Sequence, residues 1–360
     1  MIELAIAIQQ IAAPTFEEAA RAQFMRGQFE QLGLRDIHQD SVGNLYARLP
    51  GKNSTLPPLV LSAHLDTVFP ADTPLTVQRS AEYLQAPGIG DNSVALAALC
   101  ESVLRLRAQN HTLAGDLWLV ANTAEEGLGN LRGITAVCNK FGAQPRAYIV
   151  LEGIGLGEVT IGGIGSQRYQ ISAHTAGGHS WSSYGQPSAI HHLARLITAL
   201  DALPVPSMPR ASLNVGCISG GFSVNTIAAE ASLLLDLRSE DARTLQALCT
   251  QVENLTAKAA TAPGVDFRTQ IIGQRPAGNI NGDHWLVALA AESLRSVGIP
   301  PTFGAGSTDA NLPLSRGLPS ICIGLTIGER AHSLEENIRI APLEQGMQAL
   351  MYLLRHAWRD

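Results

Sequence analysis

The chain has few aromatic residues, few cysteines and no excess of basic charge. Aromatic residues make up 5% of its 360 residues, whereas hydrophobic residues make up 46%, so we expect an aliphatic core. Its five cysteines are scattered, and no two form a Cys-x-x-Cys pair. This usage excludes a disulfide framework and favours buried, reduced thiols in a cytoplasmic protein.

Other absences narrow the class of protein further. The net charge of −6, without a basic stripe that interleaves aromatic residues, argues against a nucleic-acid partner. No stretch approaches the roughly 18 uninterrupted apolar residues of a membrane helix, so no membrane partner is expected. The opening residues Met1-Ile2-Glu3-Leu4 lack the basic region of a secretory signal. A serine-hydrolase elbow (Gly-x-Ser-x-Gly) and a phosphate-binding loop are also missing.

The order of apolar segments predicts an α/β fold. Alternation of strands and helices is typical of a mostly parallel, mixed sheet covered by helices on both faces. The first helix is expected to start at a capping box formed by Thr15 and Glu18 and to end before Gly33. The expected elements that follow are strands near 43–48, 59–63, 117–122 and 147–151, and helices over 94–107 and about 129–141.

A second pattern begins after Gly163. Its order, β-α-β-β-α-β, is that of a ferredoxin-like sandwich. We expect these elements at 166–174, 187–202, 211–218, 226–237, 240–259 and 264–271. The α/β pattern then resumes with segments at 284–297, 321–325 and 342–357. The sequence therefore predicts a discontinuous domain, 1–163 with 272–360, and an inserted domain, 164–271.

Metal-binding side chains follow the ends of several expected strands. Open α/β sheets bind ligands at the carboxyl ends of their strands, so these side chains should converge there. Two histidines and several carboxylates in one place predict a site for divalent metal and a hydrolase. The residues are His64, Asp66, Asp91, Glu125, Glu126, Glu152 and His332.

The spacing of these residues in the sequence suggests that they have different roles in the metal site. His64 and Asp66 lie two residues apart and face the same way on an extended segment, so the carboxylate could fix the tautomer of the imidazole. Glu125 and Glu126 are adjacent acids, which is unfavourable unless one binds a cation while the other serves as a general base. Each residue alone has an ordinary explanation, such as an N-cap for Asp91. Their joint placement favours a metal site.

On these residues the sequence resembles the di-zinc hydrolases that include peptidase T, glutamate carboxypeptidase, carnosinase-type dipeptidases and acetylornithine deacetylase, and it is most similar to the peptidase T-like members. The resemblance spans nearly the whole chain. It implies two zinc sites that share Asp91, although cobalt or manganese could occupy them. His64 and Glu152 would complete one site, and Glu126 and His332 the other.

The same resemblance assigns the remaining chemistry. Glu125 would be the general base and acid, and Asp66 would orient His64. The peptide bond between Asp91 and Asn92 is expected to be cis, which is costly for a non-proline residue.

Three further segments resemble substrate-binding parts of this family. Gly177-Gly-His179-Ser and Gly221–Thr226 resemble lid segments whose histidine and asparagine reach the substrate, and Arg238 resembles an arginine that holds a substrate carboxylate. The glycine-rich loop near the metals supplies the other candidates. The implied substrate-binding residues are His179, Asn225, Arg238, Ser307, Thr308 and Asp309. Ordinary turn and cap chemistry is the alternative explanation for these loops.

The resemblance implies hydrolysis of an amide bond in small peptides, by a di- or tripeptide exopeptidase or a carboxypeptidase. An N-acyl amino acid deacylase would use the same site and stays open as an alternative. A non-catalytic, metal-stabilised binding protein is a third hypothesis, which the presence of Glu125 disfavours. A homodimer through the inserted domain is also implied.

Overall fold

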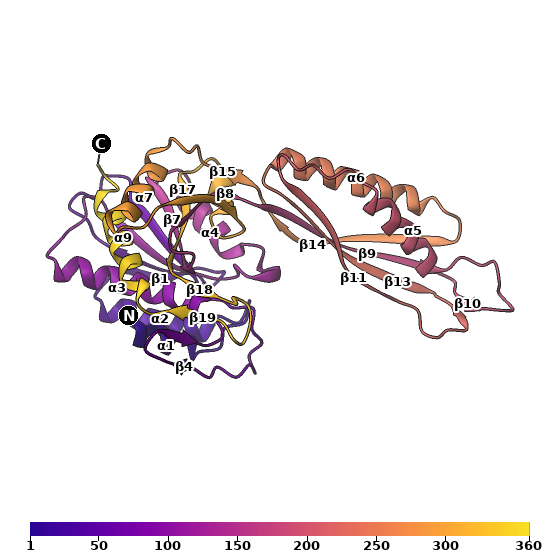
Figure 1. Cartoon of the computed structure of the whole chain (residues 1–360), viewed down its shortest axis with the longest axis horizontal. Coiled ribbons are helices and arrows are strands. Elements are labelled where there is room, and N and C mark those ends of the chain that lie inside the picture. Colours follow the sequence, from indigo (N-terminus) through magenta and orange to yellow (C-terminus); the bar gives the residue numbers. More distant parts are fainter. Residues whose placement is uncertain (360) are drawn as a thin grey trace. The chain divides into compact units, whose positions relative to one another are not determined.

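The computed structural model describes residues 1–359, which fold into two compact units (Figure 1). The first unit comprises Met1–Gly163 and Asn279–Asp360, and the second comprises Ile164–Gly278. The sequence placed the end of the second domain at residue 271. Strand β14 (Val265–Arg275) instead continues through a bulge to pair with the start of β9, so the chain returns to the first unit seven residues later than expected, at 279 rather than 272.

The first unit is built around a mixed sheet with the strand order β1-β2-β6-β3-β7-β17-β8-β15, and β16 also pairs with β8. Strands β6, β3, β7 and β17 are mutually parallel, whereas β2 pairs antiparallel with β6. The strands are β1 (Arg35–Gln39), β2 (Leu45–Leu49), β3 (Leu59–His64), β6 (Leu117–Asn122), β7 (Ala147–Ile154), β8 (Glu158–Gly163), β15 (Gly278–Asn279), β16 (Thr302–Gly306) and β17 (Ser320–Thr326).

Helices cover both faces of this sheet, as predicted. Strand β3 is buried along its whole length, and its side chains alternate between two apolar clusters. Leu61 belongs to the apolar cluster that includes residues of α3 and α9, whereas Val60 belongs to a second cluster with residues of α4. The helices are α1 (Ile2–Gln9), α2 (Ala19–Gln31), α3 (Val94–Ala108), α4 (Arg132–Phe141), α7 (Trp285–Ser296), α8 (Asn311–Ser315) and α9 (Pro342–His356).

The beginning of the chain differs from the prediction. Helix α1 was not expected, and the next helix begins at Ala19 rather than at Thr15. Phe16 has φ +80°, a left-handed conformation that no helix can include, so the capping box does not form. The Thr15 hydroxyl instead donates to the Asp66 carboxylate at 2.9 Å. Gly33 follows α2 with φ +53°, which matches the predicted C′ residue.

A small antiparallel sheet in the first unit was also missed. Its order is β18-β19-β5-β4, so the segment around residue 332 is attached to the segment that leads to Asp91. These strands are short, with two or three residues each, which leaves little periodicity to detect. They are β4 (Gln78–Arg79), β5 (Tyr83–Gln85), β18 (Gly328–Glu329) and β19 (Asn337–Arg339).

The second unit has the predicted ferredoxin-like order. Its antiparallel sheet runs β11-β13-β9-β14, and two helices pack on one face around a separate apolar cluster (Figure 1). A two-strand pairing of β10 with β12 extends from it. The elements are β9 (Gly165–Thr175), β10 (Gly178–His179), α5 (Ala189–Asp201), β11 (Ala211–Gly220), β12 (Thr226–Ile227), β13 (Glu230–Ser239) and α6 (Ala242–Ala260).

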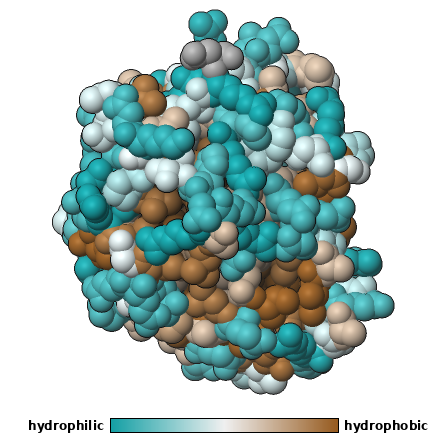
Figure 2. All heavy atoms as spheres, turned by 90° about the vertical axis from the view of Figure 1, so that its left-hand side faces the viewer, coloured by the Kyte–Doolittle hydropathy of each residue, from teal (hydrophilic) through white to brown (hydrophobic). Residues whose placement is uncertain are grey.

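Figure 2 shows one face of the molecular surface. Hydrophilic residues predominate on this face, and hydrophobic residues gather in its lower half. Among the described residues, no helix is long and apolar enough to cross a membrane.

Candidate metal centre

Asp91 lies between two histidines. Its Oδ1 atom is 2.9 Å from Nε2 of His64, and its Oδ2 atom is 3.0 Å from Nε2 of His332. His64 is the last residue of β3, Asp91 lies in the irregular turn Ile89–Ser93 before α3, and His332 lies between β18 and β19. One carboxylate thus faces two imidazoles that are 268 positions apart in the chain, which is the arrangement expected of a bridging ligand.

Two further carboxylates complete the group. Oε1 of Glu126 lies 3.1 Å from Nε2 of His332, and Oε2 of Glu152 lies 3.6 Å from Nε2 of His64. Ligand atoms of His64, Asp91 and Glu126 all lie within 4.8 Å of one another, close enough to hold one metal ion. The structure therefore brings together all five residues that the sequence nominated as ligands. His332 keeps 53% of its side chain exposed, whereas His64 is almost fully buried, with 2% exposed.

The chemistry of these groups suits a divalent cation. Imidazole nitrogen and carboxylate oxygen form the donor set of zinc, and also of cobalt and manganese. Burial raises the pKa of Glu152 to about 7, against the opposing effect of His64. Hydrogen bonds to Asp91 and Glu126 raise the pKa of His332 to about 10. Three carboxylates crowded around two imidazoles are mutually repulsive, and a cation among them would offset that repulsion.

Asp66 organises the turn that carries the two glutamates. Its Oδ1 accepts the N–H of Glu125 at 3.0 Å, and its Oδ2 accepts the N–H of Glu126 at 2.9 Å. Nδ1 of His64 lies 3.0 Å from the backbone oxygen of Asp66 but 3.6 Å from its carboxylate. The backbone carbonyl is thus the nearer group for orienting His64, and the carboxylate chiefly holds the 125–126 turn.

Glu125 sits on a tightly fixed stretch after β6. Ala124 has φ +55°, and its N–H donates to Glu18 at 3.0 Å. Glu125 itself is buried and directly precedes the ligand candidate Glu126. Among the described residues, the group of ligand atoms within 4.8 Å does not include it. Glu125 is therefore next in sequence to a candidate ligand, on a backbone held by hydrogen bonds to Glu18 and Asp66.

Asn92 was not singled out from the sequence. Its Nδ2 donates to the carbonyl of Leu151 at 2.9 Å, and its Oδ1 accepts the N–H of Gly153 at 3.0 Å. These two bonds bracket Glu152 on β7 and fix it relative to the Asp91 turn. The Asp91–Asn92 peptide is cis, as the family resemblance predicted. The resemblance therefore predicted the geometry of this peptide bond, but nothing in the sequence indicated the hydrogen bonds of the Asn92 side chain.

Glu336 is the other residue that the sequence analysis missed. Its carboxylate is fully buried and accepts the N–H groups of Gly88, Gly90 and Asp91 at 3.2, 2.7 and 2.8 Å. Burial raises its pKa to about 7, although the backbone hydrogen bonds act in the opposite direction. Little in the sequence indicated this role. Glu336 directly follows Glu335, and two adjacent glutamates in a loop resemble a solvated acidic turn.

The 306–311 loop agrees only in part with the prediction. Ser307 and Thr308 are partly exposed, and the Thr308 N–H donates to Asn311. Asp309 is fully buried and accepts a hydrogen bond from Asn122 at 2.6 Å, at the end of β6. Asp309 thus has no exposed surface and faces Asn122, so its expected substrate contact has no support from its exposure and stays a prediction.

The second unit contains three of the predicted substrate-binding residues, of which two lie at one end of the unit and the third lies away from them. The β10–β12 pairing sets His179 opposite Thr226, and the Ser180 N–H donates to the carbonyl of Asn225 at 3.0 Å, so His179 and Asn225 share one end of the unit. Arg238 lies near the far end of β13, where its Nε donates to Asp236 at 2.7 Å.

Comparisons with known proteins identify the family of this chain. Residues 60–356 match the family described as Peptidase family M20/M25/M40. A Peptidase M20 domain-containing protein of Schizosaccharomyces pombe is 30% identical over 56% of this chain, and the match spans about half (50%) of that relative. The succinyl-diaminopimelate desuccinylase of Paracoccus denitrificans is 24% identical over 84% of this chain and 83% of its own length.

Solved structures share the fold over the whole chain. Aminopeptidase PepT of Bacillus cereus has a TM-score of 0.83 at 19% identity, covering 99% of both chains. A tripeptidase of Staphylococcus aureus has a TM-score of 0.84 at 20% identity, covering 99% of this chain and 98% of its own. With a family match over most of its length and a group of side chains that could hold a metal ion, the chain belongs to peptidase family M20/M25/M40 and is a hydrolase.

Proposed function

We propose that this protein hydrolyses an amide bond of small peptides with the help of two zinc ions. The observation that carries the proposal is the placement of Asp91, whose two oxygens face two different histidines at 2.9 and 3.0 Å. His64 and Glu152 would hold one ion together with Asp91, and Glu126 and His332 the other. Cobalt or manganese fits the same donor set.

Glu125 is proposed as the general base. Bound zinc would supply Lewis acidity and lower the pKa of an attacking water. Glu125 accepts the proton of that water and returns it to the leaving amine. The Asp66 carboxylate accepts the N–H groups of both Glu125 and Glu126, which fixes the backbone of the two adjacent glutamates. Ser307 and Thr308 are proposed to contact the substrate beside the ligands.

Two observations bear on the choice of amide. Proteins named aminopeptidase and tripeptidase share the fold over nearly their whole length, which favours peptides. Several sequence relatives are named succinyl-diaminopimelate desuccinylase, which supports an N-acyl amino acid deacylase as the second candidate. Retention of Glu125 and of all five ligand candidates disfavours a non-catalytic binding protein.

Geometry within the second unit supports the expected homodimer. Gly221 bonds to Glu230, which joins the end that bears His179 and Asn225 to the start of β13. Arg238 lies eight residues further along this strand, roughly 26 Å away at about 3.3 Å per residue. A dipeptide or tripeptide is much shorter, so we propose that His179 and Asn225 act on the substrate of a second copy, while Arg238 holds the carboxylate of its own. Dimerisation and cytoplasmic location stay predictions.

The test of the reaction is Glu125→Gln. We expect turnover to fall by about 10²–10⁴-fold, because the proton acceptor is lost, while metal content is unchanged. Hydrolysis should be measured on dipeptides, tripeptides, and N-acetyl and N-succinyl amino acids, with bound metal measured by elemental analysis. The matched control is Glu30→Gln on the exposed face of α2, which should leave both quantities unchanged. Full activity in the Glu125 variant would rule out this base.

The substrate panel separates the two candidates. Cleavage of di- or tripeptides with no turnover of N-acyl amino acids supports the peptidase. The reverse pattern supports the deacylase. Metal binding without cleavage of any amide would revive the binding-protein hypothesis.

A further inference from the structure

Glu336 connects two segments that bear candidate ligands of the same ion. Its carboxylate accepts three N–H groups from the turn that ends in Asp91. Oε2 accepts from Gly88, and Oε1 accepts from both Gly90 and Asp91. Glu336 has no exposed surface, so water cannot replace these bonds.

The backbone of Glu336 is fixed as firmly as its side chain. Its carbonyl accepts the N–H of Ala86 at 2.9 Å, which continues the pairing of β19 with β5. Its own N–H donates to the carbonyl of Ser333 at 3.1 Å, closing a turn that begins one residue after His332. The segment that carries His332 is therefore attached at both its backbone and the Glu336 side chain to the turn that carries Asp91.

The backbone of the turn that carries Asp91 is closely packed. A Cβ on Gly90 would lie 2.8 Å from both Ile154 and Ile338, so this stretch of backbone already fits closely against its neighbours. Gly88 has φ +72°, and its carbonyl accepts the hydroxyl of Ser93 at 2.6 Å. The Glu336 carboxylate accepts three of the backbone N–H groups of this closely packed turn.

We propose that Glu336 is a positioning residue that sets the spacing between Asp91 and His332, and with it the affinity of the second ion. The inference rests on the proposed two-ion site. The observed spacing is 3.0 Å between the Asp91 carboxylate and the His332 ring. Asn92 ties Asp91 to the strand of Glu152 independently, so the first ion depends less on Glu336.

A carboxylate suits position 336 because all three backbone groups that it faces are hydrogen-bond donors. Three N–H groups need acceptors only, and an ionised glutamate offers two acceptor oxygens and no hydrogen. Glutamine at this position keeps one oxygen for Gly90 and Asp91 but turns an amide N–H toward the N–H of Gly88. Alanine leaves all three donors without a partner. The affinity of the second ion should therefore fall in the order Glu, Gln, Ala.

The experiment is a zinc titration of the metal-free full chain by calorimetry, repeated with cobalt to follow the absorption of each site. The wild type should take up two ions. In Glu336→Gln we expect the second ion to bind about 10–100-fold more weakly, the usual effect of losing a partner that orients a ligand, with the first ion unchanged. Glu336→Ala should lose the second ion altogether, and if it fails to fold, Glu336→Gln decides.

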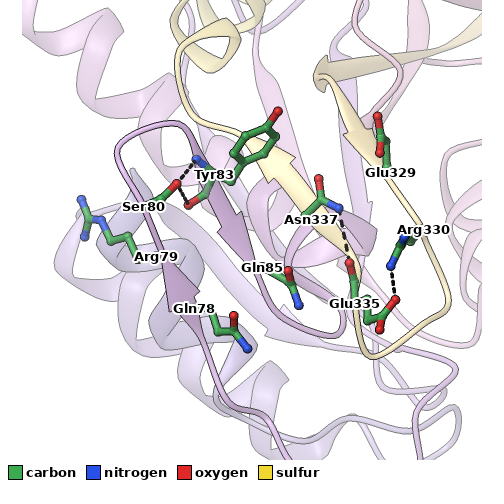
Figure 3. A pocket seen from close by; sticks show the side chains of 9 residues that line it. All are labelled: Gln78, Arg79, Ser80, Tyr83, Gln85, Glu329, Arg330, Glu335 and Asn337. Carbon is green, nitrogen blue, oxygen red and sulfur yellow. Dashed lines mark hydrogen bonds and ion pairs between the residues drawn. The ribbon is translucent and has the colours of Figure 1, made fainter.

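Glu335→Gln is the matched control. Glu335 directly precedes Glu336 but makes an exposed ion pair with Arg330 (Figure 3), so the same chemical change there should leave both affinities unchanged. In a His332→Ala background, which already lacks the second ion, Glu336→Gln should not weaken the remaining one. A general loosening of the fold would weaken it.

The outcomes separate this inference from the function on which it rests. If the wild type binds two ions and Glu336→Gln binds both equally well, the positioning role is wrong and the two-ion site stands. Weakening of the remaining ion in the His332→Ala background would also overturn it. A wild type that takes up no metal would refute both.

Discussion

At the scale of single residues, the candidate ligands are held by side chains that do not face the centre themselves. Asp66 joins the end of β3 to the 125–126 turn, Asn92 joins the Asp91 turn to β7, and Glu336 joins that turn to the His332 segment. Each makes hydrogen bonds to backbone groups of another ligand-bearing segment. Metal sites commonly depend on such outer partners nearly as much as on the ligands.

Asn92→Asp tests one of these connections. The new carboxylate has nearly the same shape but cannot donate to the Leu151 carbonyl, and it would place a charge where the side chain has no exposed surface. We expect the free energy of unfolding to fall by about 1–3 kcal/mol, measured by urea denaturation. Asn53→Asp is the control, because the Oδ1 of this exposed side chain accepts from Thr55 and an aspartate keeps that acceptor. An Asn92 variant as stable as the wild type would contradict the connection.

At the scale of elements, the site depends on close approach between β7 and the Asp91 turn. Gly153 on β7 has no side chain, and a Cβ there would lie 2.0 Å from the carbonyl oxygen of Gly90. This oxygen belongs to rigid backbone, so the two segments would have to separate. Glycine is thus required where Glu152 must approach Asp91.

Gly153→Ala should therefore destabilise the fold by about 1–3 kcal/mol or more and weaken zinc binding, since overpacking shifts the backbone on both sides. Gly27→Ala makes the same change in α2, where a Cβ meets nothing within 4 Å. There the helix should gain about 0.5–1 kcal/mol. Denaturation and zinc titration of both variants check the pair, and a tolerated Gly153→Ala would show that β7 can move.

The N-terminal segment also braces the site at this scale. Arg21 of α2 is buried and donates to the carbonyls of Ile11 and Leu65, and burial lowers its pKa to about 10. Glu18 accepts the N–H of Ala124 beside the glutamate pair. These residues precede residue 60, where the family match begins, so the brace belongs to a part of the chain that the match does not cover.

At the scale of the whole molecule, two units have separate apolar cores. The second unit leaves and rejoins the first at adjacent positions, because Ser166 at its start pairs with Arg275 near its end. A segment whose ends meet in one strand pair can be excised without breaking its sheet.

We therefore expect residues 164–278 to fold alone, with a single cooperative thermal transition by circular dichroism. A shorter fragment, 164–262, lacks β14, one of the two strands that pair with β9 along its length, so it should not fold cooperatively. If the longer fragment shows no cooperative transition, the second unit depends on the first for its stability.

Much of the fold could be predicted from apolar periodicity. Strands such as β3 and β6 are continuous apolar runs because both of their faces are buried, and the helices between them follow. The capping box at Thr15 failed because the hydroxyl found a distant partner, Asp66, and Phe16 took a left-handed conformation. Local sequence cannot report such competition.

The sequence by itself determined the mixed sheet and the inserted sandwich and nominated the candidate metal ligands, because these depend on periodicity and on the ends of strands. Only the tertiary structure decided which side chains hold those ligands in place. Glu336 reaches the N–H of Asp91 across 245 positions of sequence, and Asn122 reaches Asp309 across 187. Contacts of that range arise from how the strands are ordered in the sheet, and no periodicity along the chain encodes that order.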